Sequence, residues 1–117
     1  MENLPNYQIV SCSGASNTGK YSDEVARMTM SSGAAKMLCL ARFSIDKPFA
    51  ATSKTEIKNL IVLDGCPINC AEKTMKENGI ENYTHINITD FDIVKGKTPF
   101  NHEKVNEIVE HIKKIIQ

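Results

Sequence analysis

Four cysteines are the residues of this chain whose type and spacing could do chemistry. Three are evenly spaced, because 39 minus 12 and 66 minus 39 both give 27 residues, and the fourth follows four positions later. In a reducing compartment, such cysteines bind metals or do redox chemistry more often than they form structural disulfides. The four are Cys12, Cys39, Cys66 and Cys70.

The clearest local pattern is the turn that begins at Asp64 and follows an apolar run over residues 59–63. The run is short and branched, as expected for a strand buried on both faces of a parallel sheet. We predict that Cys66 caps a helix, that Pro67 is its first residue and that Cys70 lies one turn on. Both sulfurs then lie at one helix N-terminus, whose free N–H groups and dipole favour thiolate over thiol.

Periodicity and turn residues predict the remaining elements. Ser22 is expected to cap a helix that ends near Gly33, and a short helix is expected after Pro48. Asn101 is expected to cap a last helix, in which apolar residues repeat at three and four positions. The other predicted strands are residues 7–11, 35–40 and 84–88, of which 35–40 has the weakest pattern.

Strands that alternate with helices in this way predict an α/β fold. We expect a single domain over residues 1–117, with about four mainly parallel strands and helices on both faces. If the first strand is central, the strands have the common order 2-1-3-4. The cysteines then lie at the carboxyl edge of the sheet, at the crevice where such folds bind ligands. Four thiolates that converge there predict a tetrahedral metal site, with zinc as the first choice and an iron–sulfur cluster as the alternative.

Three segments also carry a likeness to a known family. They are Cys12-Ser-Gly-Ala-Ser-Asn-Thr-Gly, Lys36-Met-Leu-Cys39-Leu-Ala and Leu63-Asp-Gly-Cys66-Pro-Ile-Asn-Cys70-Ala. In order and spacing, over about residues 10–97, they resemble the DGC-motif family, which is named for Asp-Gly-Cys and expected to bind zinc. The resemblance implies a small α/β domain with four metal-chelating cysteines, at the same four positions, and it implies no reaction.

The segment from Gly14 to Lys20 supports a different interpretation. It fits the phosphate-loop pattern G-x-x-x-x-G-K after a strand and before a helix, which would predict nucleotide binding, with Asp64 near the magnesium. However, Tyr21 stands where a serine or threonine hydroxyl would bind magnesium, and 117 residues are few for an NTPase. A turn of small residues explains the same pattern, and both interpretations stay open.

Covalent thiol chemistry at Cys12 is the second alternative. A cysteine, a loop of small residues and a helix form the layout of cysteine phosphatases and arsenate reductases. That chemistry needs an arginine six positions on, where this chain has Thr18. A redox pair of Cys66 and Cys70 is a further alternative, although three residues separate them in place of the two in thioredoxin-like motifs.

Charge and hydropathy narrow the classes of partner. Lys plus Arg and Asp plus Glu are 14 each, and this balance predicts no nucleic-acid partner. No window approaches about 18 consecutive apolar residues, and residues 1–8 lack the features of a secretory signal. We therefore expect no membrane partner and predict a cytoplasmic protein. The sequence indicates no particular protein partner, substrate or oligomeric state.

Overall fold

Four parallel strands form one sheet at the centre of the protein, in the order β2-β1-β3-β4. Strand β1 pairs with both β2 and β3, and β3 pairs with β4. The predicted α/β class and strand order are therefore confirmed. The computed structural model describes residues 6–116, with the strands β1 (Gln8–Ser11), β2 (Lys36–Met37), β3 (Leu60–Asp64) and β4 (Thr84–Asn87).

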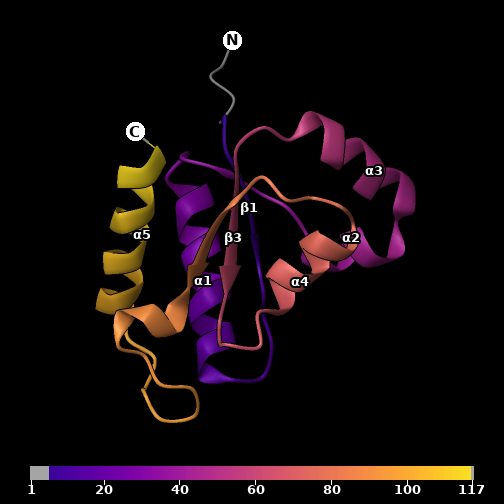
Figure 1. Ribbon diagram of the computed structural model, residues 1–117. Coiled ribbons are helices and arrows are strands. Elements are labelled where there is room, and N and C mark those ends of the chain that lie inside the picture. Colours follow the sequence, from indigo (N-terminus) through magenta and orange to yellow (C-terminus); the bar gives the residue numbers. More distant parts are fainter. Residues whose placement is uncertain (1–5, 117) are drawn as a thin grey trace.

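Helices cover both faces of the sheet, as predicted (Figure 1). Helices α1 and α5 pack on one face, and α2, α3 and α4 pack on the other. The loops that follow β1 and β3 lie at the lower end of Figure 1. The helices are α1 (Asn17–Ser31), α2 (Leu40–Ile45), α3 (Lys47–Glu56), α4 (Cys70–Glu77), the 3-10 helix η1 (Ile88–Phe91) and α5 (His102–Ile116).

Strand β3 contributes to both hydrophobic cores, because successive side chains of a strand point to opposite faces. Ile61 and Leu63 belong to the core under α1 and α5, and Leu60 and Val62 belong to the core under α2, α3 and α4. All five residues of β3 are buried. This burial on both faces explains why an apolar run without alternation marks the strand.

The start of α1 differs from the prediction. The helix begins at Asn17 because the hydroxyl oxygen of Ser16 accepts the N–H of Gly19 at 3.1 Å. Ser22, the predicted cap, is buried inside the helix, and its hydroxyl donates to the carbonyl oxygen of Leu63 at 3.4 Å. The prediction of a cap at Ser22 was wrong, since an earlier serine already satisfies the helix N-terminus.

Other boundaries follow local capping chemistry. The expected helix around Pro48 is α3, which Asp46 caps by accepting the N–H of Phe49 at 3.1 Å. The predicted cap of α5 is confirmed, because the Asn101 side chain accepts the N–H of Glu103 at 2.7 Å. The strand predicted over residues 35–40 is shorter, with two residues in β2, and the next residues form α2, a helix that the sequence did not predict.

Candidate metal centre

Cys12 lies where the two central strands end side by side. Ser11 is the last residue of β1 and pairs with Leu63 of β3. The N–H of Cys12 then donates to the carbonyl oxygen of Leu63 at 2.9 Å, which continues the ladder by one residue. Cys12 is thereby held next to Asp64, at the predicted carboxyl edge of the sheet.

Asp64 caps helix α4 from outside the helix. Its side chain is fully buried, and its carboxylate accepts the N–H of Ala71 at 2.7 Å and the N–H of Glu72 at 3.0 Å. The helix therefore begins at Cys70, and Cys66 and Pro67 lie in a preceding turn. The predicted cap at Cys66 and helix start at Pro67 were wrong, because the capping group comes from the end of β3.

Gly65 brings the β3–α4 turn into direct contact with α1. A Cβ atom on Gly65 would lie 2.8 Å from the carbonyl carbon and oxygen of Thr18 and 3.0 Å from the nitrogen of Gly19. Any side chain here would push the two segments apart. The glycine thus lets the turn that carries Cys66 pack on the helix that follows the Cys12 loop.

Asn87, at the end of β4, fixes the turn from its other side. Its Nδ2 donates to the carbonyl oxygen of Cys66 at 2.9 Å and to Oδ1 of Asn69 at 2.8 Å. Asn69 has a left-handed backbone with φ 58°, a conformation that asparagine tolerates better than most residues. Sequence reasoning missed Asn87, and its position at the carboxyl end of a predicted strand was the one available signal.

His85 of β4 supports the buried carboxylate. Its Nε2 lies 2.8 Å from Oδ2 of Asp64, and its Nδ1 lies 3.7 Å from Oε1 of Glu72. The hydroxyl of Tyr83 donates to Oε2 of Glu72 at 2.9 Å. These side chains connect β4 to the first turn of α4, and so they help to position Cys70.

Two of the predicted ligands, Cys66 and Cys70, lie near a third, Cys12. Burial, together with the nearby Cys70, Asp64 and Cys66, raises the pKa of the half-buried Cys12 thiol to about 11. Of these neighbours, Cys70 has the largest effect on the Cys12 thiol. Cys66 is half-buried and Cys70 is exposed. A thiol with a raised pKa stays protonated at neutral pH, the opposite of what a nucleophilic cysteine requires.

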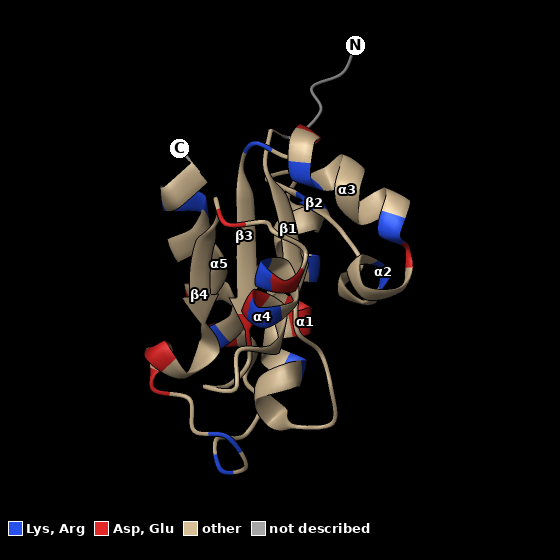
Figure 2. Cartoon of the chain, turned by 45° about the vertical axis from the view of Figure 1, so that its right-hand side comes forward, with Lys and Arg blue, Asp and Glu red and all other residues tan. Residues whose placement is uncertain are grey.

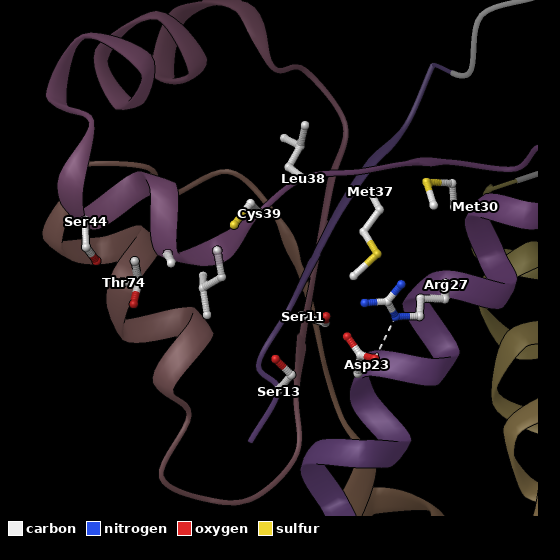
Figure 3. A pocket seen from close by; sticks show the side chains of 12 residues that line it. Ser11, Ser13, Asp23, Arg27, Met30, Met37, Leu38, Cys39, Ser44 and Thr74 are labelled. Atoms are coloured by element: carbon white, nitrogen blue, oxygen red, sulfur yellow. Dashed lines mark hydrogen bonds and ion pairs between the residues drawn. The ribbon is translucent and has the colours of Figure 1, made fainter. Parts of the chain in front are cut away.

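Cys39, the fourth predicted ligand, lies between β2 and α2. It is exposed, immediately precedes α2, and makes no side-chain cap hydrogen bond. It lines a cleft of about 550 Å³ at the carboxyl edge, together with Ser11 and Ser13 on either side of Cys12 (Figure 3). An ion pair between Arg27 and Asp23 of α1, with Nε and Oδ2 2.7 Å apart, forms another wall of this cleft.

The donor chemistry of this edge fits zinc, because thiolate sulfur is a preferred zinc ligand and thiolates also bind iron–sulfur clusters. Within residues 6–116, however, no three His, Cys, Asp or Glu side chains are already placed to hold a metal ion. A metal would have to draw the sulfurs together from their present positions. The four-cysteine ligand set and the identity of the metal therefore stay predictions.

The segment from Gly14 to Lys20 forms a tight loop and the first turn of α1. A Cβ atom on Gly19 would lie 2.8 Å from the nitrogen of Gly14, so the loop folds closely against the helix. The Lys20 ammonium lies 4.2 Å from the centre of the Phe100 ring, in a cation–π contact. Nucleotide binding by this segment stays a prediction that the contacts do not test.

Comparison with known families agrees with this arrangement. The family model of the DGC domain matches residues 8–112. The chain belongs to the DGC family. The match extends beyond the residues 10–97 over which we expected the likeness, and it includes most of α5. In this DGC protein, the motif residues are Asp64, Gly65 and Cys66.

A curated relative is the Anaerobic and virulence modulator AnvM of Pseudomonas aeruginosa. It is 23% identical over 87 residues, which are 74% of this chain and 66% of the relative. The matched part is thus slightly less than two thirds of that protein's length. No solved structure matches the DGC protein. Within residues 6–116, none of the helices has the length and apolar character needed to cross a membrane.

Proposed function

We propose that this DGC protein binds one metal ion, zinc, through the thiolates of Cys12, Cys66 and Cys70, with Cys39 as the fourth ligand. The observation that carries the proposal is the grouping of Cys70 and Cys66 around Cys12 at the carboxyl edge. Neighbouring thiols are costly to ionise together unless a cation balances their charge. A zinc ion supplies that balance. The cytoplasm, where thiols stay reduced, is the proposed location.

The position of Cys39 determines what kind of site results. If Cys39 also binds the metal, four sulfurs fill its coordination sphere, and the site has a structural or metal-handling role. If Cys39 remains exposed, the fourth position belongs to water, which a zinc ion can activate as a Lewis acid. An iron–sulfur cluster would use the same thiolates, and its visible absorption distinguishes it from colourless zinc.

The first experiment is elemental analysis of protein purified without oxygen. We expect about one zinc per chain, no visible absorption band, and thiols that react with a mild reagent only after a chelator is added. Because the ligands must be deprotonated, zinc should leave progressively on acidification. Folded protein with four promptly reactive thiols and no uptake of added zinc would contradict the proposal.

Serine variants then test each ligand. We expect Cys12→Ser, Cys66→Ser and Cys70→Ser each to abolish zinc retention in a competition with a chelator, because each removes a sulfur from the gathered group. Cys39→Ser should weaken zinc binding least, since Cys39 is exposed and follows the two-residue strand β2. Pairs of variants should be strongly non-additive, because the first loss already breaks the site. Unchanged zinc content in all four would remove the cysteine site.

A further inference from the structure

A lysine from a distant loop contacts one of the cysteine sulfurs. Nζ of Lys95 lies 3.6 Å from Sγ of Cys66, within hydrogen-bond range for sulfur. Lys95 belongs to the loop between η1 and α5, which projects at the lower end of Figure 2 with its lysines in blue. In the part of the chain from 6 to 116, it is the one cation in hydrogen-bond contact with a cysteine.

The side chain of Asn17, the first residue of α1, holds this loop in place. Its Nδ2 donates to the carbonyl oxygens of Val94 at 3.0 Å and Thr98 at 2.8 Å. Its Oδ1 accepts the N–H of Gly96 at 2.6 Å. Across the loop, Oγ1 of Thr98 accepts the N–H of Val94 at 2.7 Å. Hydrogen bonds on both sides of Lys95 therefore fix the backbone that presents its ammonium.

The positive charge of Lys95 would balance part of the negative charge of a metal–thiolate site. Four thiolates around one divalent ion leave about two negative charges in excess. The buried carboxylate of Asp64 is a further negative charge close to Cys12. An ammonium that donates to a ligating sulfur reduces this excess and orients the sulfur. Partners of this kind typically change metal affinity by about 10- to 100-fold.

We propose that Lys95 is a positioning residue of the metal site, which holds Cys66 in place and offsets the charge of the thiolates. This inference rests on the proposed function, because it needs a metal that the cysteines bind. It also gives a reason for the three hydrogen bonds that Asn17 makes with an exposed loop. Without that clamp, the lysine would sample many positions and lose its hold on Cys66.

Substitution of Lys95 tests the inference on the full chain. Lys95→Met removes the ammonium and keeps most of the side-chain length, and Lys97→Met is the matched control in the same exposed loop. Zinc affinity is measured by competition with a chromophoric chelator, at low and high salt. We expect Lys95→Met to weaken zinc binding by about tenfold, Lys95→Arg to restore it, and Lys97→Met to have no effect. Added salt should narrow the gap, because it screens an exposed charge.

The outcomes separate this inference from the proposed function. The metal-free Lys95→Met protein should melt at the temperature of the unmodified chain, which shows that folding is not the cause of weaker binding. Equal zinc affinity of Lys95→Met and Lys97→Met would overturn the role of Lys95 and leave the proposed function standing. Failure of the unmodified chain to bind zinc would overturn both.

Discussion

The two sides of the carboxyl edge that carries the cysteines differ in how firmly burial and hydrogen bonds hold them. On the side of β3 and α4, a fully buried strand ends in a carboxylate that caps the next helix, and Gly65 packs against the backbone of α1. On the side of β2 and α2, the strand is two residues long at the edge of the sheet. Cys39 follows that strand, exposed and without a cap hydrogen bond.

On the side of β3 and α4, each residue of the family motif has a separate structural role. Asp64 fixes the helix that carries Cys70, Gly65 allows the close approach of α1, and Cys66 brings a sulfur that Lys95 contacts. The backbone that carries Cys66 and Cys70 is therefore fixed by contacts within the protein. Changes there should lower both stability and metal binding, whereas changes around Cys39 should affect metal binding alone.

Loss of the buried cap should have the largest effect. Asp64→Ala leaves the N–H groups of Ala71 and Glu72 and the ring of His85 without their partner. Each buried group left unpaired costs about 1–3 kcal/mol, so we expect a loss of about 3 kcal/mol or more in the free energy of unfolding. Urea unfolding of the metal-free protein measures it.

The control for this prediction is Asp46, the partly exposed cap of α3. Asp46 also accepts an N–H at a helix start, and that bond from Phe49 lowers its pKa, helped by Arg42. Asp46→Ala should be clearly less destabilising than Asp64→Ala, because solvent replaces the lost partner. Its contribution should be present above the ordinary pKa of 3.8 and disappear as the pH falls below it. Equal losses in the two variants would contradict the contrast between the sides.

The reactivity of Cys12 and Cys39 toward a thiol reagent should also differ strongly. A pKa of about 11 in place of 9.0 leaves Cys12 with about a hundredfold less thiolate at pH 8. We expect iodoacetamide to label exposed Cys39 first and Cys12 far more slowly in metal-free protein, as read by mass spectrometry. Folding favours the protonated Cys12 thiol, so this stabilisation is present below about pH 9 and is lost as the pH rises through about 11. Rapid labelling of Cys12 at pH 8 would contradict its burial.

A smaller effect is expected from glycine substitutions. Gly65→Ala places a methyl group 2.8 Å from the backbone of Thr18, and overpacking of this kind costs about 1–3 kcal/mol. Gly14→Ala is the matched control, because nothing lies within 4 Å of a Cβ atom there. We expect a lower melting temperature and weaker zinc retention for Gly65→Ala alone. Equal behaviour of the two variants would show that the turn does not depend on the contact with α1.

The sequence predicted the parts of this site that depend on local pattern. The apolar run before Asp64, the even spacing of the cysteines and the alternation of strands and helices were sufficient for the sheet order and the shared edge. The start of α4 could not be predicted, because its capping carboxylate lies seven residues before Ala71. Helix α2 was missed because it has six residues and lies immediately before α3.

Contacts between distant segments were the other part that sequence patterns could not supply. Asn17 and Gly96 are 79 residues apart, and Lys95 and Cys66 are 29 apart. No periodicity connects such pairs, since the fold alone brings the loops to one edge. The same limit applies to Cys39, whose even spacing predicted the correct edge but not its exposed position before α2.

The smallest expected effect concerns Tyr83, which lies on the side of β3 and α4. Its hydroxyl donates to Glu72 in the first turn of α4, so Tyr83→Phe should cost about 1 kcal/mol at neutral pH. Burial, together with the hydrogen bond to Glu72, raises the pKa of Tyr83 from 10.0 to about 12. The stabilisation should therefore be complete below pH 10 and disappear as the pH rises through about 12.

Urea midpoints of the unmodified chain, Tyr83→Phe and the control Tyr7→Phe, taken from pH 7 to pH 12, measure this effect. The gap between the unmodified chain and Tyr83→Phe should be constant up to about pH 10 and then close, because ionised tyrosine has no hydrogen to donate and is repelled by Glu72. The gap for Tyr7→Phe should not follow this course. A Tyr83 gap that persists to pH 12 would mean that ring packing, and not the bond to Glu72, connects β4 to the helix of Cys70.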